Sequence, residues 1–172
     1  MNETPRGNRL HISLFGRRNA GKSSLINALT NQSLAIVSSV AGTTTDPVYK
    51  SMEILPLGPV VVIDTAGLDD VGELGKLRIE KSLEVLRKSD LVLLVTDATL
   101  GIGAPEKELA EKCRLQKIPF LLVFNKTDLE TPAAEALENA KSELGAAAAV
   151  AVSASERRGI GDLKIAMVRH AP

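Results

Sequence analysis

One short segment combines glycines, a lysine and a serine at the spacing of a phosphate-binding loop. Gly16-Arg17-Arg18-Asn19-Ala20-Gly21-Lys22-Ser23 fits the pattern G-x-x-x-x-G-K-[ST]. Glycines let the backbone wrap around a phosphate, so that N–H groups point inward, and a following helix adds its positive end. A surface turn is the alternative, but the segment follows a predicted strand and opens a predicted helix. We expect six residues to bind nucleotide here: Asn19, Ala20, Gly21, Lys22, Ser23 and Ser24.

Two further segments could complete a metal and γ-phosphate site around this loop. Lys22 would reach the β- and γ-phosphates, and the Ser23 hydroxyl would be a ligand of Mg²⁺. Asp64 begins the segment Asp-Thr-Ala-Gly directly after a buried strand, and would meet the Mg²⁺ directly or through water. Gly67 would place a backbone N–H on the γ-phosphate. By itself this short segment would be read as a surface turn.

The segment Gly-Thr-Thr-Thr-Asp at residues 42–46 lies in a long polar stretch. A threonine here could ligate Mg²⁺ only when the γ-phosphate is present, so that hydrolysis would release the loop. Composition does not select among the three threonines. A run of threonines in a loop is usually just exposed to solvent. We assign Thr44 to the metal, and Lys22, Thr44 and Gly67 to catalysis.

Two segments near later strand ends could read a base. Asn125-Lys126-Thr127-Asp128 follows an apolar run, and the Asp128 carboxylate can accept hydrogen bonds from the N1–H and N2–H₂ edge of guanine. Adenine lacks that donor pair and would leave the carboxylate unpaired. The stem of Lys126 can lie over the base, Asn125 can tie loops together, and a backbone N–H near Ser153 and Ala154 can reach the guanine O6.

Composition limits the other functions that the chain could have. The 172 residues carry 21 Lys+Arg and 21 Asp+Glu, with 44% apolar residues, as in one ordinary globular domain. A neutral chain with 2% aromatic residues argues against a nucleic-acid binder with a basic or stacking surface. The single cysteine, Cys113, excludes an internal disulfide or cysteine-ligated cluster, fits a cytosolic compartment and is expected in the core. No apolar run is long enough to span a bilayer.

The elements that must position these residues alternate between short apolar runs and helical patterns. Strands are expected at Leu10–Phe15, Val48–Leu55, Val60–Ile63, Leu91–Val95, Ile118–Phe124 and Ala148–Val152. Helices are expected at Gly21–Leu29, Leu74–Lys88, Pro105–Gln116, Pro132–Leu144 and Asp162–His170, with a long loop at 31–47. This alternation predicts an α/β fold with a six-stranded, mostly parallel sheet and helices on both faces. The strands at 48–55 and 60–63 are joined by few residues and should pair antiparallel.

These motifs, in this order, resemble the translation-factor-related small GTPases, a branch that also holds tRNA-modifying and ribosome-assembly GTPases. The resemblance implies a Ras-like P-loop GTPase domain at 9–170 after an N-terminal extension at 1–8. A closer resemblance, over essentially the whole chain, is to the GTPase domain of the [FeFe]-hydrogenase maturation GTPases. It is carried by residues 4–12, 42–48 and 56–67. Thr45-Asp46-Pro47 is the most specific part, because related GTPases tend to carry arginine at its first position.

The closer resemblance implies a scaffold protein that assembles the diiron part of hydrogenase. Its dimerisation and iron–sulfur domains would be absent from this chain. The implied partners are GTP and GDP, the other domains of the full-length protein, the hydrogenase maturation enzymes, apo-hydrogenase and a second GTPase domain. We expect a cytoplasmic location and neither a membrane nor direct nucleic-acid binding. The alternative function is a switch GTPase of tRNA modification or ribosome assembly.

Departures from the usual pattern shape the expected mechanism. Leu68 follows Gly67 where many GTPases carry a water-orienting glutamine, so intrinsic hydrolysis should be slow. Arg17 and Arg18 are expected to be solvated rather than to act as an arginine finger. In resembling GTPases an asparagine at the position of Asn19 ligates K⁺. We therefore hypothesise that Asn19 and backbone carbonyls of 38–44 bind K⁺ and accelerate hydrolysis. The alternative is that the Asn19 side chain only stabilises the turn of the loop. The candidate water positioners are acidic residues that could equally be solvated: Asp69, Asp70 and Glu73.

Overall fold

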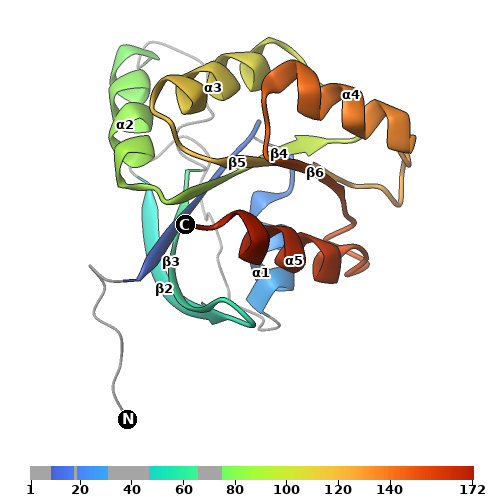
Figure 1. Ribbon diagram of the computed structural model, residues 1–172, viewed down its shortest axis with the longest axis horizontal. Helices are drawn as coiled ribbons and strands as arrows, with labels where there is room; N and C mark the ends of the chain where they lie inside the picture. Colours follow the sequence, from blue (N-terminus) through green and yellow to red (C-terminus); the bar gives the residue numbers. More distant parts are fainter. Residues whose placement is uncertain (1–8, 18, 31–46, 66–74) are drawn as a thin grey trace.

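The computed structural model describes residues 9–17, 19–30, 47–65 and 75–172, with no side-chain description for 75–79. Strands and helices alternate along most of it (Figure 1). The strands are β1 (Leu10–Phe15), β2 (Val48–Ile54), β3 (Gly58–Asp64), β4 (Leu91–Asp97), β5 (Phe120–Asn125) and β6 (Ala148–Ala151). The helices are α1 (Lys22–Thr30), α2 (Gly75–Lys88), α3 (Ala104–Leu115), α4 (Ala134–Leu144) and α5 (Ile160–His170).

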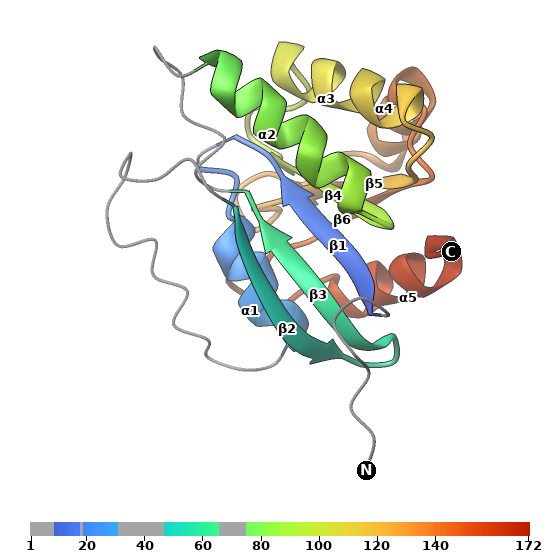
Figure 2. The ribbon, with the colours of Figure 1, turned by 90° about the vertical axis from the view of Figure 1, so that its left-hand side faces the viewer.

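The six strands form a single sheet in the order β2-β3-β1-β4-β5-β6. Only β2 and β3 run antiparallel, as predicted, and a three-residue turn at 55–57 joins them. The other neighbours are parallel, with Ile12 beside both Val62 and Leu91 in the register. Figure 2 shows β2, β3 and β1 side by side at one edge of this sheet. Because parallel strands need crossover connections, the helices must lie on the faces of the sheet.

Helices cover both faces of the sheet, which confirms the predicted architecture. One face packs against α1 and α5, and the other against α2, α3 and α4 (Figure 1). Successive residues of β4 alternate between the two cores: Leu91 and Leu93 belong to the first, and Val92 and Leu94 to the second. β4 and β5 are therefore apolar on both sides, which is why each reads as an unbroken apolar run in the sequence.

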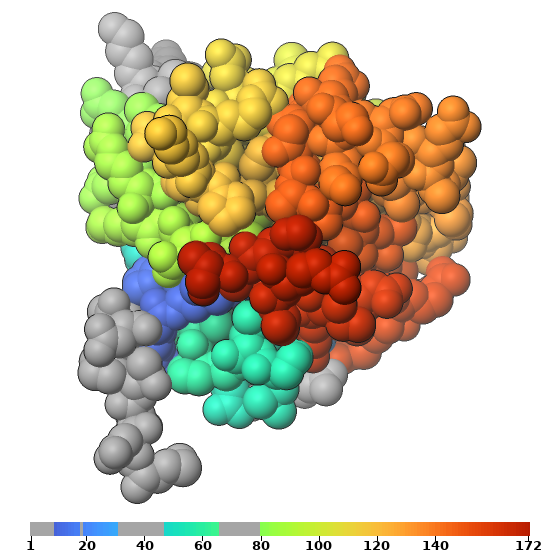
Figure 3. All heavy atoms as spheres, viewed as in Figure 1, coloured from blue at the N-terminus to red at the C-terminus, as the bar shows by residue number. Residues whose placement is uncertain are grey.

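The helical layers make up much of the outer surface. In the space-filling view, α3, α4 and α5 occupy most of the face toward the viewer (Figure 3). Cys113 of α3 is fully buried beneath this layer, as the sequence predicted. Among the helices in the described residues, none has the length and apolar character needed to cross a membrane.

Several element bounds differ from the predictions, and two of the differences bear on function. β4 continues past the predicted end at Val95 to Asp97, and β5 extends through Asn125. Both strands therefore end on a polar side chain at the carboxyl edge of the sheet. A third difference is at α3, which begins at Ala104, so that Pro105 is not its first residue as predicted. The predicted stop of α4 is confirmed, since Gly145 adopts a left-handed conformation with φ of 76°.

Candidate functional site

The polar segments gather at the carboxyl edge of the parallel sheet. β1 leads into the glycine-rich loop, β3 ends at Asp64, β5 ends at Asn125, and Ser153 follows β6. In open α/β sheets this edge forms the crevice in which ligands bind. The fold therefore brings together segments that lie more than a hundred residues apart in the chain.

Two glycines of the loop are required by its geometry. A Cβ on Gly16 would overlap the carbonyl oxygen of Val95 in the neighbouring strand β4. Gly21 has φ of +90°, and a Cβ there would overlap Nδ2 of Asn125. Both positions need glycine because backbone passes close to another element, and Gly21 also needs the left-handed region. The loop is thus held close to the strands behind it.

Lys22, Ser23 and Asp64 lie at the ends of the elements that frame this loop. Lys22 begins α1, is 4% exposed, and its Nζ donates to the carbonyl oxygen of Gly16 at 2.5 Å. Asp64 at the end of β3 is also 4% exposed. The next residue, Thr65, is fully buried and donates from its hydroxyl to the carbonyl of Leu14 in β1. A buried lysine and a buried carboxylate at one strand edge suit a phosphate and a hard cation.

Asn125 joins the phosphate-binding loop to the base-reading segments. Its Nδ2 donates to the carbonyl of Ala20 at 2.9 Å, and its Oδ1 accepts from the amide of Ala154 at 3.0 Å. The side chain is 2% exposed, and its partners lie on two different loops. The structure therefore shows the tying contact that the sequence suggested for Asn125.

Asp128 is oriented by the segment after β6. The hydroxyl of Ser153 donates to Asp128 Oδ1 at 2.8 Å, which fixes one carboxylate oxygen and leaves the other for a ligand. The Ala154 amide, considered for the guanine O6, already donates to Asn125. A base carbonyl at this amide would share the donor with Asn125 or replace it.

Asp97 is a site residue that the sequence reasoning missed. Its Oδ2 lies 3.1 Å from Lys126 Nζ, and its Oδ1 accepts from the amide and hydroxyl of Thr99 at 2.8 and 2.6 Å. Burial alone would raise the pKa of Asp97, but the bonds from Thr99 and the Lys126 charge outweigh it and hold that pKa below its ordinary value. The rule used for Asp64, a carboxylate closing a buried strand, would have found Asp97 had β4 been extended to its real end.

Arg17 is not the solvated loop tip that was predicted. Its Nε and Nη2 donate to Glu106 Oε2 and Oε1 of α3 at 2.9 and 2.7 Å. The Arg17 side chain is 38% exposed, whereas that of Glu106 is 1% exposed. This hydrogen bond raises the pKa of Arg17 above its ordinary value. The prediction failed because the partner lies 89 positions away and no local pattern reports it.

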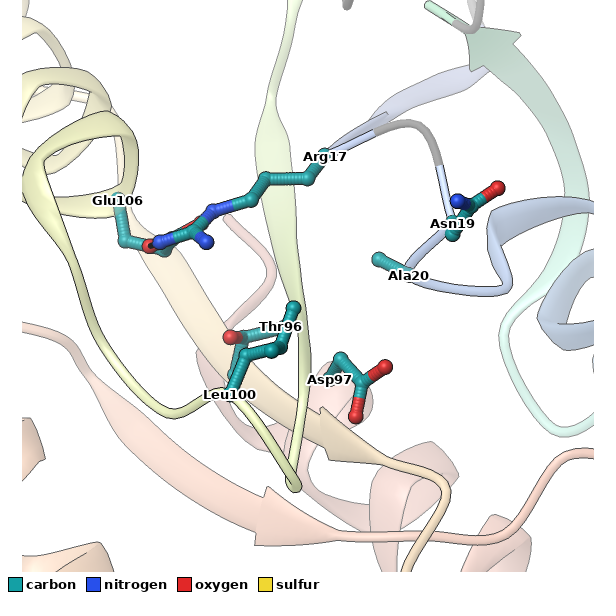
Figure 4. A pocket seen from close by; sticks show the side chains of 7 residues that line it. All are labelled: Arg17, Asn19, Ala20, Thr96, Asp97, Leu100 and Glu106. Carbon is teal, nitrogen blue, oxygen red and sulfur yellow. Dashed lines mark hydrogen bonds and ion pairs between the residues drawn. The ribbon is translucent and has the colours of Figure 1, made fainter.

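A pocket of about 170 Å³ opens beside the loop (Figure 4). Figure 4 shows Arg17 reaching from the loop to Glu106 on one side, with Asp97 and Leu100 on the other. The lining residues are Arg17, Asn19, Ala20, Thr96, Asp97, Leu100 and Glu106. The loop residues Asn19 and Ala20 therefore border empty space on the side of β4.

Several predicted residues lie outside the described part of the chain. They are Thr44, Gly67, Arg18, Leu68, Asp69, Asp70, Glu73 and the carbonyls of 38–44. Within the described residues no group of three or more His, Cys, Asp or Glu side chains could hold a metal. A Mg²⁺ site at Ser23 and Asp64 would not form such a group, because one of its ligands is a hydroxyl.

A phosphate-binding-loop pattern and an Asn-Lys-x-Asp segment on one edge of an α/β sheet are typical of P-loop GTPase domains. The model of the 50S ribosome-binding GTPase family matches residues 11–126. The chain belongs to that family. The matched region includes the loop at 16–23, Asp64 and Asn125, and it ends at Lys126, before Asp128, Ser153 and Ala154.

Relatives in curated collections are named tRNA modification GTPase MnmE. One from Dechloromonas aromatica is 39% identical over 163 residues, which is 93% of this chain and 34% of the relative. One from Chromobacterium violaceum is 39% identical over 158 residues, covering 90% of this chain and 33% of the relative. The chain thus spans about a third of the length of the curated relatives it matches.

Solved structures confirm the Ras-like fold. Aquifex aeolicus Era bound to GDP and AlF₄⁻ superposes with a TM-score of 0.78 at 25% identity, covering 94% of this chain and 56% of that one. Era in complex with MgGDPNP and a segment of 16S ribosomal RNA gives 0.76 at 26% identity, with the same coverages. A probable GTP-binding protein, engB, gives 0.73 at 20% identity, which speaks for the fold alone.

Proposed function

We propose that this domain binds GTP and GDP with Mg²⁺, hydrolyses GTP slowly, and acts as a switch within a longer protein. The observation that carries the proposal is the Asn125 bridge between Ala20 and Ala154, together with the Ser153–Asp128 bond. These contacts join a phosphate loop and a carboxylate suited to guanine in one preformed frame. Family membership and the GTPase relatives support the same activity.

Each site residue then has a role in the proposed complex. Backbone amides of 19–24 hold the phosphates, with Lys22 on the β- and γ-phosphates. Asp128 accepts from N1–H and N2–H₂ of guanine, and the Lys126 stem covers the base plane with its ammonium held by Asp97. Ser153 and Ala154 close the base pocket, while Thr44 and Gly67 would contact the γ-phosphate side.

The residues present suit Mg²⁺. Ser23 offers a hydroxyl and Asp64 a buried carboxylate, which are the oxygen donors that this ion prefers. Thr44 would add a ligand when GTP is bound. The ion supplies charge neutralisation at the β- and γ-phosphates, where negative charge shifts during hydrolysis.

K⁺ stimulation through Asn19 is part of the proposal. Asn19 is exposed at the loop, so its amide oxygen can face a ligand there. Because Leu68 offers no water-orienting amide, an added cation would compensate for the slow intrinsic rate. GTP hydrolysis should be faster in KCl than in NaCl at equal ionic strength, and equal rates would remove the K⁺ role.

For the process that the switch serves, we infer tRNA modification or a related RNA-associated role. The support is the set of relatives named tRNA modification GTPase at 39% identity over nearly the whole chain. Expression of the full-length protein in a strain lacking its own tRNA modification GTPase tests this. Restored modification would support the inference, and a soluble, GTP-hydrolysing protein that restores none would contradict it.

Hydrogenase maturation is the second candidate, favoured by one specific observation. The segment Thr45-Asp46-Pro47 has threonine at its first position, where related GTPases tend to carry arginine, and residues 56–67 extend the same resemblance. Under this candidate the missing parts would be dimerisation and iron–sulfur domains, and the partners would be hydrogenase and its maturation enzymes. A cluster-ligating cysteine set in the full-length protein would favour it over the first.

The nucleotide proposal itself is tested by binding and turnover of the purified domain. Wild-type protein should bind fluorescent GDP far more tightly than fluorescent ADP and release phosphate from GTP. Lys22→Ala should abolish both by removing the phosphate-facing charge. Equal affinity for adenine and guanine nucleotides, or no phosphate release with Mg²⁺ and K⁺ present, would contradict it.

A further inference from the structure

The phosphate-binding loop leaves β1 and borders a pocket on the side of β4. Asn19 and Ala20 line this pocket on one side, and Thr96, Asp97 and Leu100 line it on the other (Figure 4). Protein interiors normally fix a loop by close packing from beneath. Ala20 packs into the core shared with α1 and α5, but the pocket leaves the β4 side of Asn19 and Ala20 open, so polar contacts contribute to the position of the loop on that side.

Two anchors hold the described part of the loop, and they come from opposite sides. At one end the side chain of Arg17 is bound by Glu106, while the carbonyl of Arg17 accepts from the amide of Ala20 at 3.0 Å. At the other end the carbonyl of Ala20 is bound by Asn125. A turn closed between Arg17 and Ala20 is thus fixed by α3 on one side and by β5 on the other.

The Glu106 anchor is itself rigid. Its Oε1 accepts from the amide of Gly103 at 2.7 Å as well as from Arg17, and its side chain is 1% exposed. A Cβ on Gly103 would overlap Arg17 Nη2, so the guanidinium is also packed against backbone. A buried carboxylate with three donors holds a fixed geometry, and a fork of two parallel bonds orients the arginine as well as binding it.

We propose that Glu106 is a positioning residue of the nucleotide site, which holds the phosphate-binding loop in its ligand-ready place through Arg17. The inference rests on the proposed function. It adds α3, which holds none of the predicted nucleotide-binding residues, to the elements that position the nucleotide site. Glu106 would affect the binding of the phosphates, because the amides of the loop must be placed to donate to the oxygens of the β- and γ-phosphates. Asn125 joins this loop to the base loop, but the Asp128 carboxylate that would read the guanine amino group is oriented by Ser153.

The test uses Glu106→Gln and Arg17→Lys. Glutamine keeps the size of Glu106 and removes its charge, and lysine keeps the charge of Arg17 and removes the fork. In both variants we expect the affinity for GDP and kcat for GTP to fall, each by roughly 10- to 100-fold, because a displaced loop misaligns the donors. The preference for GTP over ITP, which lacks the amino group that Asp128 reads, should stay at the wild-type value.

The matched control is Lys107→Ala, at the next position of α3. Lys107 pairs with Glu143 at 3.3 Å, and both side chains are more than half exposed, so affinity and kcat should not change. Urea unfolding of each variant shows that it is folded under assay conditions. If a variant loses stability while affinity and kcat stay at the wild-type values, Glu106 only holds α3 and the inference is wrong.

A failure of the inference can be told apart from a failure of the proposed function. Wild-type protein that does not bind guanine nucleotides removes the proposed function before any variant is compared. Wild-type protein that binds and hydrolyses GTP, with unchanged Glu106→Gln and Arg17→Lys variants, overturns only the positioning role. A variant that loses GTP-over-ITP preference together with affinity also overturns it, since the damage would then reach the whole site.

Discussion

At the scale of single residues, Asn125 has more consequences than its size suggests. One amide group satisfies a buried carbonyl on the phosphate loop and a buried amide on the base loop. Losing the Asn125 side chain would be costly in free energy, because a buried polar group without a hydrogen-bond partner is destabilised by its full desolvation cost. The site's two halves are thus coupled before any nucleotide arrives.

Asn125→Ala should therefore destabilise the nucleotide-free domain as well as weaken nucleotide binding. Leaving the Ala20 carbonyl and the Ala154 amide unpaired should lower the free energy of unfolding by about 2–4 kcal/mol. Urea titration measures this. Thr131→Ala removes an exposed side-chain bond to the Thr127 carbonyl and is the control, with a change of about 0.5 kcal/mol or less. Equal small losses in both variants would contradict the bridging role.

At the scale of elements, the ends of strands and helices decide where chemistry can occur. Pattern and turn residues predicted every strand of the sheet and its single antiparallel pair, because both follow from local periodicity and connection length. Asp97 was missed because the apolar run stops at Val95 while hydrogen bonding continues to Asp97 beside Asn125. The Arg17–Glu106 pair could not be predicted, because only the packing of α3 against the loop brings the two side chains together.

Two glycines at element ends predict opposite responses to the same change. Gly161 in the first turn of α5 and Gly58 at the start of β3 both have open space where a Cβ would go, but Gly58 has φ of +93°. Gly161→Ala should raise the free energy of unfolding by about 0.5 kcal/mol by reducing the freedom of the unfolded chain. Gly58→Ala should lower it by about 1 kcal/mol or more through left-handed strain. Thermal or urea unfolding of both variants measures these changes. A change of the same sign in both variants would contradict the argument from backbone conformation.

At the scale of the whole molecule, a chain of zero formal charge is proposed to bind a highly charged nucleotide. In the proposed complex, backbone amides, the N-terminus of α1, Lys22 and Mg²⁺ would supply the positive field locally, so no basic surface would be required. Binding energy gained only by the folded state also stabilises the entire fold. The buried cysteine offers a way to observe this linkage.

Cys113 should react with a thiol reagent only when the fold opens. It is fully buried, and burial raises the pKa of its thiol to about 12, so almost no thiolate is present at pH 8. GDP with Mg²⁺ should slow labelling in proportion to nucleotide saturation. Rapid labelling that nucleotide does not change would show that α3 opens independently of the site.

The raised pKa of the Cys113 thiol makes the free energy of unfolding depend on pH in a defined direction. The thiol stays protonated in the folded state up to pH about 12, whereas its ordinary pKa is 9.0. Its contribution to stability is complete below pH 9 and is lost as pH rises toward 12, because the unfolded chain releases the proton first. Cys113→Ala should show a smaller loss of unfolding free energy between pH 8 and 10.5 than wild type. An identical loss would contradict the burial of the thiol.

The measurement that tests the central claim most directly is the base preference of Asp128→Asn. In the wild type, Ser153 fixes Oδ1 and leaves the second oxygen to accept from guanine. Asparagine can keep the Ser153 bond through Oδ1 and present an N–H₂ donor, which matches the O2 carbonyl of xanthine. We expect the variant to lose GDP affinity by roughly 100-fold or more and to prefer xanthosine diphosphate. A variant that still prefers GDP would contradict the assignment of Asp128 and of the site built around it.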